Sequence, residues 1–283
     1  MKRNACVRKI LAVGLLAFII LAGPGTPLRA EEENPTGDFS TSVLSGYVWR
    51  GYELSRNSVV VQPSMTIGYK GFTANVWGNL DTKAYSAGTA DYPGTWNETD
   101  LTLSYSKSVG PVTLGGGYIY YSLASLNRDA ADRLDSQEFF VSVAGNMLLT
   151  PTLTIYKEID HYRQWYFLFG VSHVFELSKA VSLKLAASAS YLLSTDETPY
   201  PKCDENAMPT SEKFSNFHDG TVSASLPIKV SDHITLTPAV SYIFPLSGTA
   251  KDEMKYFGFK GTTLNSERDS AFLVGGLTAS FSF

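Results

Sequence analysis

The sequence predicts an all-β protein, namely a transmembrane, antiparallel, up-and-down β-barrel of about 12 strands that follows a cleaved signal peptide. First, segments of about ten residues alternate between apolar and small polar side chains, the two-residue period of a strand with two different faces. Second, only 18% of the residues are charged, whereas 13% are aromatic, which indicates a surface that meets something other than water. Third, the chain after residue 30 has no apolar stretch long enough for a spanning helix. A closed barrel is the other way to cross a bilayer with every backbone group hydrogen-bonded.

Residues 1–30 have the pattern of a secretory signal peptide. Lys2, Arg3, Arg8 and Lys9 precede the apolar stretch 10–23, and small residues lead to a cleavage site after Ala30. The alternative is a retained membrane helix, for which this stretch is short, because a span needs about 20 residues. We therefore expect one domain, the barrel of residues 31–283.

Charge and cysteine content restrict the possible partners of the mature chain. The first 30 residues contain five of the 23 lysines and arginines and no acid, which leaves 18 against 27 acids and a net charge near −9. This balance argues against nucleic acid as a partner. Removal of the signal peptide also leaves a single cysteine, Cys203, so no internal disulfide is expected.

Twelve alternating segments follow in order, and the eighth is apolar on both sides, so that its facing stays open. Connections are long or polar after the first, third, fifth, ninth and eleventh segments and tight after the even ones, which predicts short periplasmic turns and longer outer loops. The first and seventh connections are the weakest members of this series. The segments are 40–52, 59–69, 72–81, 100–106, 112–121, 138–144, 152–160, 165–177, 181–193, 219–228, 234–242 and 275–283.

The alternative fold is a secreted soluble sandwich or propeller with its apolar faces buried. Its second faces would carry many Lys, Glu and Arg side chains, whereas here they carry mainly Ser, Thr, Asn, Gly and Ala, which suits the interior of a narrow barrel. Aromatic residues also gather towards the segment ends, where membrane girdles lie. They are Trp49, Tyr52, Tyr69, Tyr105, Tyr120, Tyr121, Trp165, Tyr166, Tyr191 and Tyr242.

The last segment alternates up to a terminal aromatic residue, with Phe281 and Phe283 on its apolar face. The whole pattern resembles a Gram-negative outer-membrane protein, in which such a strand is the signal read by the barrel assembly machinery. More narrowly, SGYVWRGYELS with the following Gln62 resembles the Tyr-x-x-Arg-Gly first-strand signature of the TorF family, a porin-like family without well-defined substrates. The signature falls on Tyr47, Arg50, Gly51 and Gln62 and covers a small fraction of the chain.

A twelve-stranded barrel lies between filled eight-stranded barrels and open porins of about 16 to 18 strands, which predicts a narrow or partly obstructed lumen. With the strand facing inferred above, five acids point into the lumen near the outer ends of their strands, and Arg50 is a possible counter-charge. The hypothesis is passive diffusion of small solutes or ions with a weak preference for cations. The alternatives are that the acids brace the wall, or that Arg50 contacts lipopolysaccharide phosphates at the rim. The acids are Asp81, Asp100, Glu138, Glu158 and Asp160.

The positions of the four histidines bear on whether the barrel could be an enzyme. Ser172 and His173 are adjacent and therefore on opposite faces of a strand, while His161, His218 and His233 are expected at loop or turn positions with no serine at a matching spacing. We expect no catalytic residue, metal site or cofactor. The other candidate function is a non-conducting scaffold, receptor or adhesin that acts through outer loops such as the acidic segment 200–216.

Overall fold

The computed structural model describes residues 34–55, 58–83, 94–123, 135–257 and 264–283. The predicted signal peptide, residues 1–30, lies outside the described residues, and its cleavage site stays a prediction. No helix of the described part is long and apolar enough to cross a membrane.

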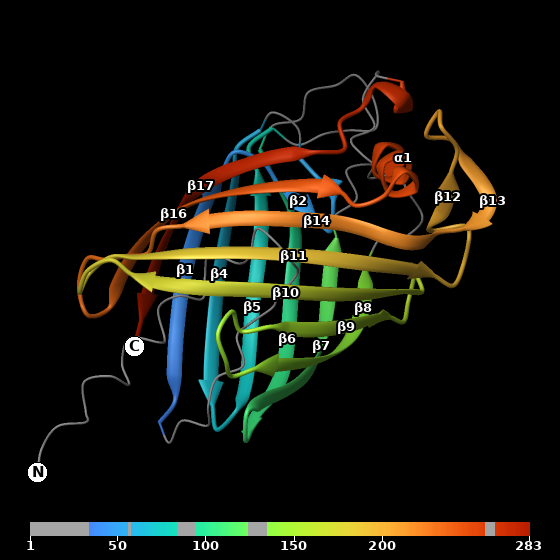
Figure 1. The fold of residues 1–283 in the computed structure, drawn as a ribbon. Helices are drawn as coiled ribbons and strands as arrows, with labels where there is room; N and C mark the ends of the chain where they lie inside the picture. The colour runs from blue at the N-terminus through green and yellow to red at the C-terminus, as the bar shows by residue number, and fades with distance from the viewer. Residues whose placement is uncertain (1–33, 56–57, 84–93, 124–134, 258–263) are drawn as a thin grey trace, which may run out of the picture.

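Twelve strands of the described chain form a wall around one central axis (Figure 1). Each wall strand pairs antiparallel with the wall strand before it, and the first and last pair with each other at the seam. The sheet has 13 strands in all, and the remaining one, β15 (Ile228–Lys229), pairs with β16 and forms a bridge from Ile228 to Val181. The predicted closed, up-and-down barrel is confirmed. The wall strands are β1 (Thr36–Leu44), β4 (Val60–Tyr69), β5 (Phe72–Asp81), β6 (Thr95–Val109), β7 (Val112–Leu123), β8 (Ser136–Gly145), β9 (Thr152–Glu158), β10 (Gln164–Glu176), β11 (Ser182–Ser194), β14 (Ser215–Ser225), β16 (Ile234–Pro245) and β17 (Phe272–Ser282).

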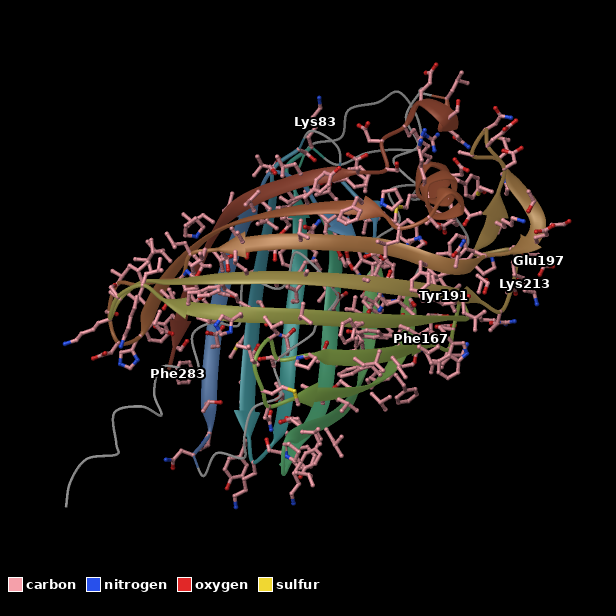
Figure 2. All side chains as sticks on the ribbon, in the orientation of Figure 1. Lys83, Phe167, Tyr191, Glu197, Lys213 and Phe283 are labelled. Carbon is pink, nitrogen blue, oxygen red and sulfur yellow. The ribbon has the colours of Figure 1, made fainter. Side chains whose placement is uncertain are left out.

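Alternation along each wall strand separates an apolar outer face from a polar inner face. On β1 and β17, Phe39 and Phe281 are opposite each other and exposed, whereas the neighbouring Ser40 and Ser280 are buried. Phe167 and Tyr191, labelled in Figure 2, are cross-strand partners on the outward face of β10 and β11. A closed barrel with this apolar exterior is the architecture of a Gram-negative outer-membrane barrel.

The seam between β1 and β17 joins the two ends of the described chain. Phe283 donates its N–H to the carbonyl of Gly37 and accepts from the Gly37 N–H, both at 2.9 Å. The predicted terminal strand is therefore hydrogen-bonded to its last residue, and Phe281 and Phe283 stay exposed on the outer face. Their role as an assembly signal stays a prediction.

The first predicted strand, 40–52, is too long. β1 ends at Leu44, and the chain then leaves the wall to form a hairpin of β2 (Val48–Trp49) and β3 (Tyr52–Glu53). Arg50 and Gly51 form its two-residue turn with positive φ angles of 49° and 83°, which an extended strand cannot accommodate. Tyr52 packs among inward-facing wall residues, so the hairpin lies inside the barrel.

Two outer loops contain structure that the strand pattern did not predict. The β11–β14 loop forms a hairpin of β12 (Pro201–Cys203) and β13 (Pro209–Lys213). The β16–β17 loop contains α1 (Gly248–Phe257) and the short 3₁₀ helix η3 (Asn265–Glu267). Figure 1 shows α1 and this hairpin at one end of the barrel and the C-terminus at the other.

The helix α1 begins at a capping serine and turns one face toward the barrel. Ser247 Oγ accepts the N–H of Ala250 at 3.1 Å, which satisfies one of the free donors of the first turn. Ala250 and Met254, four residues apart and therefore on one helix face, are buried in the same cluster as Tyr52. The helix thus covers the hairpin from the side of the long loops, which in an outer-membrane barrel is the outer side.

Candidate pore site in the barrel lumen

The turn of the β2–β3 hairpin brings Arg50 against the inner wall. Its Nη1 and Nη2 donate to the two carboxylate oxygens of Glu138 on β8, both at 2.7 Å, and the Tyr121 hydroxyl donates to Glu138 Oε2 at 2.9 Å. The side chains of Arg50 and Glu138 are each 1% exposed. The structure thus brings the predicted counter-charge together with one of the five predicted acids, in the bidentate geometry that gives the strongest ion pairs.

Three aromatic rings surround the Arg50 guanidinium. Its Cζ lies 4.5 Å from the ring centre of Trp49, 4.6 Å from Tyr156 on β9 and 4.4 Å from Tyr166 on β10. A guanidinium group is planar and weakly hydrated, so that it stacks on ring faces while its edge binds a carboxylate. Ring faces and a carboxylate together therefore hold Arg50.

Two other residues of the signature, Tyr47 and Gly51, also fix the position of the hairpin. The Tyr47 hydroxyl lies beside the Glu98 carboxylate of β6. Gly51 packs beside the Met254 side chain of α1, and its φ angle of 83° favours glycine. Gln62 lies on the wall instead, where its Nε2 donates to Asn79 Oδ1 at 3.0 Å. Three of the four signature residues therefore position the hairpin.

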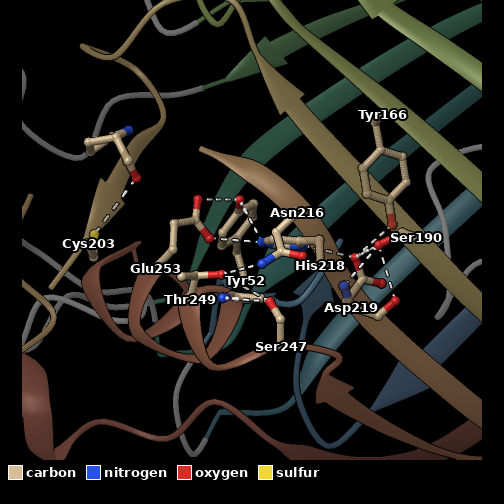
Figure 3. A network of polar contacts seen from close by, with 12 residues as sticks. Tyr52, Tyr166, Ser190, Cys203, Asn216, His218, Asp219, Ser247, Thr249 and Glu253 are labelled. Atoms are coloured by element: carbon tan, nitrogen blue, oxygen red, sulfur yellow. Dashed lines mark hydrogen bonds and ion pairs between the residues drawn. The ribbon is translucent and has the colours of Figure 1, made fainter. Parts of the chain in front are cut away.

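A second buried network joins the hairpin to α1 through His218 on β14 (Figure 3). His218 Nε2 lies 2.8 Å from Glu253 Oε2 of α1, and its Nδ1 lies 3.1 Å from Asp219 Oδ1. The Tyr52 hydroxyl donates to Glu253 Oε1 at 2.7 Å. The hairpin, the helix and the wall thus share one polar network in the outer half of the lumen.

Asp219 also connects this network to the wall. Its Oδ1 accepts from the Tyr166 hydroxyl at 2.8 Å and from Ser190 Oγ at 2.6 Å. Tyr166 is also one of the rings around Arg50. The two networks are therefore coupled through a single tyrosine.

Glu158 stabilises the turn that follows β9. It lies directly opposite Glu138 on the neighbouring strand, at the same height as predicted. Ser136 Oγ donates to it at 2.9 Å. The backbone N–H groups of the following turn, those of Asp160, His161, Tyr162 and Arg163, also donate to it. Its carboxylate organises the β9–β10 turn, which favours the bracing alternative for this acid.

The remaining predicted acids have different surroundings. β9 ends at Glu158, so Asp160 lies in the turn, where it accepts from Gln137 Nε2 at 3.1 Å. Asp81 is buried at the end of β5 and accepts the N–H of Lys83 at 3.0 Å. Asp100 is buried on the inner face of β6, and its Oδ1 has no hydrogen-bond partner within the described part of the chain.

Several lumen residues were missed or misplaced by sequence reasoning. Glu98 precedes Asp100 by two residues and shares its face, so extending the alternation by one pair would have found it. His218 was expected in a loop but lies buried within β14. Ala250, Met254 and Phe257 have helical spacing, which was the available signal for α1.

The aromatic girdle prediction was partly wrong. Trp49, Tyr52, Tyr121 and Tyr166 pack inside the lumen rather than at a membrane interface. Exposed rings on the outer surface include Tyr69, Tyr105, Trp165 and Tyr242. A strand-end position does not by itself reveal which way a ring points.

The sequence matches no protein-family model and no curated protein. Among solved structures, the NanC porin is similar with a TM-score of 0.51 and 11% identity over 87% of this chain and 98% of that one. The fold is porin-like. At this identity the similarity shows the fold alone, and the TorF resemblance stays a prediction.

Weaker similarities include OmpT of Vibrio cholerae, with a TM-score of 0.39 and 8% identity over 90% of this chain and 100% of that one. BamA from Haemophilus ducreyi lacking POTRA domains 1–3 has a TM-score of 0.36 and 14% identity over 89% of this chain and 71% of that one.

The two halves of this porin-like lumen differ in the elements that they contain. In the outer half, inward side chains are buried, among them Asn79, Ile119 and Ser190. In the periplasmic half, inward side chains range from buried, such as Thr113 and Thr237, to half-buried, such as Thr66 and Ser104. The β2–β3 hairpin and α1 pack against the wall residues of the outer half, and obstruction of the lumen stays a prediction.

Proposed function

We propose that this outer-membrane barrel admits small solutes or ions by passive diffusion and weakly prefers cations. Glu98 and Asp100, two residues apart on the inner face of β6, carry this proposal. Within the described ranges neither has a basic partner, whereas Glu138 is paired with Arg50 and Glu253 contacts His218.

Two acids without a basic partner on the inner wall favour cations over anions once they are ionised. Because burial without a counter-charge disfavours ionisation, this preference should grow as the pH rises. Charge on inward-facing side chains sets selectivity in narrow pores, where the surrounding wall has a low dielectric constant. The Arg50–Glu138 pair contributes little net charge, because it contains both signs, whereas His218 faces two carboxylates, those of Asp219 and Glu253. The preference is therefore expected to depend on Glu98 and Asp100 more than on Glu138.

The partners follow from the two surfaces of the barrel. The apolar outer face suits the lipid bilayer, lipopolysaccharide is expected at the outer rim, and Phe281 and Phe283 suit recognition by the barrel assembly machinery. A role without catalysis is supported by His218, whose two ring nitrogens face carboxylates of Asp219 and Glu253. A general base for a serine or cysteine nucleophile needs one nitrogen free for that group.

A second candidate is a non-conducting scaffold, receptor or adhesin that acts through its outer loops. The observation that favours it is the hairpin in the outer half, which is anchored by a buried ion pair and by α1. A lumen that stays blocked at this end would conduct nothing.

Planar-bilayer recording of the purified, refolded barrel tests both candidates. Discrete current steps and a reversal potential on the cation side in a KCl gradient are expected. The double variant Glu98→Gln with Asp100→Asn should lose most of this preference, whereas Glu212→Gln on the exposed β13 should keep it. Clear anion preference would refute the selectivity proposal. Silence, together with ligand binding that depends on the loops, would favour the receptor.

A further inference from the structure

The surroundings of Arg50 form a complete binding site for a guanidinium group. Four wall residues from the consecutive strands β7 to β10 contribute to it, and we call them the guanidinium cage. Glu138 provides the two acceptor oxygens, Tyr156 and Tyr166 provide ring faces, and Tyr121 holds the carboxylate. Carboxylate and rings are the groups that recognise a planar cation.

The cage is held by contacts that do not involve Arg50. The Tyr121 hydroxyl donates to Glu138, and the Tyr166 hydroxyl donates to Asp219. The ring centres of Tyr156 and Tyr166 are 6.1 Å apart, and Phe140 packs against Tyr156 at 5.7 Å. A site whose groups are already positioned loses little conformational freedom when it binds a ligand.

Arg50, in contrast, belongs to an element that is not part of the wall. β2 and β3 have two residues each and pair only with each other among the described strands. The cage therefore binds the tip of a separate loop, much as a receptor binds a ligand. Trp49 is on the same hairpin and would leave the site together with Arg50.

The charge of Glu138 links movement of the hairpin to a replacement cation. Withdrawal of Arg50 alone would leave a buried carboxylate without a counter-charge, which is strongly unfavourable. A second guanidinium group at the same atoms would remove this penalty. A ligand that binds only the hairpin-out state shifts the population toward that state.

We propose that the cage is a binding site for small guanidinium solutes, which compete with Arg50 and so displace the β2–β3 hairpin from the outer lumen. The planar, bidentate group is preferred over a simple ammonium ion, because only the former matches both carboxylate oxygens and the ring faces. Binding itself is independent of the proposed function. The consequence, that a cationic solute moves the hairpin out of its own diffusion path, rests on the proposed function.

The test is thermal unfolding of the detergent-folded barrel with methylguanidinium chloride at millimolar concentrations, against KCl at the same ionic strength. In Arg50→Ala the intramolecular competitor is gone, and its effective concentration is roughly millimolar for a short loop. We expect saturable stabilisation, with half-saturation at least about tenfold lower than in the unsubstituted barrel. The double variant Arg50→Ala with Glu138→Gln should show none.

Arg163→Ala is the matched control, because this arginine is 65% exposed on the β9–β10 turn and contacts no cage residue by its side chain. It should respond as the unsubstituted barrel does. If Arg50→Ala does not fold, Arg50→Lys keeps the charge and should still bind methylguanidinium more tightly than the unsubstituted barrel. A folded Arg50 variant without saturable stabilisation, or an equal response after loss of Glu138, overturns the inference.

Bilayer recording separates this inference from the proposed function. Binding of methylguanidinium by a barrel that conducts nothing would remove the proposed function and leave the site standing. Conductance without such binding would have the opposite meaning. If both hold, methylguanidinium should raise the current of the unsubstituted barrel. It should not raise the current of Arg50→Ala, which lacks the competing side chain.

Discussion

The two halves of the lumen are built in different ways. The periplasmic half is lined by small hydroxyl side chains that bond to one another, such as Ser108 and Thr113 at 2.9 Å. The outer half is filled by loop residues, aromatic rings and paired charges, with Arg50 on Glu138 and Glu253 on His218. Strand alternation alone builds the first half, whereas the second needs inserted loops, and the two should respond differently to substitution.

The largest effect is expected at the centre of the outer half. Glu138→Gln leaves the Arg50 guanidinium buried without its counter-charge, which should lower the free energy of unfolding by about 3–5 kcal/mol. Replacing both residues by leucine should recover most of this loss. Urea unfolding in detergent measures both variants, and Glu212→Gln on the exposed β13 is the control. Equal stability of Glu138→Gln and the control would show that the ion pair does not hold the hairpin.

A large side chain introduced into each half of the lumen should affect stability differently. Ser190→Trp places a large ring in the packed outer half, where Ser190 is buried against Asp219, and should cost at least about 1–3 kcal/mol. Ser104→Trp places the same ring on a half-buried inward position of the periplasmic half. It should keep the stability and reduce the conductance. A well-folded Ser190→Trp barrel would contradict the packing of the outer half.

A loss of about 1–3 kcal/mol is expected when the anchor of the helix is weakened. Glu253→Gln removes the charge that faces His218 and accepts from Tyr52. Backbone amides of α1 should then exchange faster with deuterium, while those of β4 and β5 keep their protection. Ser108→Ala, which removes one hydroxyl bond of the periplasmic half, is the matched comparison and should leave α1 exchange unchanged.

The smallest effect concerns the outer hairpin β12–β13 and changes reactivity rather than stability. Burial raises the pKa of the Cys203 thiol to about 12, with Glu253, Asp204 and Asp252 adding to the shift. The thiol therefore stays protonated at pH 8, and its labelling becomes fast only as the pH approaches that value. We expect alkylation at pH 8 at least about a hundredfold slower in the folded barrel than after unfolding. Equal rates would place Cys203 in solvent.

Much of the wall could be read from local pattern. A strand exposes its faces with a period of two, so a segment with clear alternation, such as 72–81, reveals its own lipid side, whereas segment 165–177, apolar on both sides, does not. Alternating turn lengths indicate the side of the membrane on which each connection lies. Asp81, Asp100, Glu138 and Glu158 were therefore assigned to the inner face of the wall before any contact was known. The phase of a strand is local information, and a sequence contains it directly.

The content of the lumen was decided only by the tertiary structure. Arg50 and Glu138 are 88 residues apart, and Tyr52 and Glu253 are 201 apart. The turn at Arg50 and Gly51 interrupts an alternating segment that otherwise resembles a continuing strand, so no local pattern distinguishes a wall strand from an inserted hairpin here. What selects the hairpin is the free energy of pairing its charge and rings with groups on strands far along the chain, and those groups become neighbours only once the barrel closes.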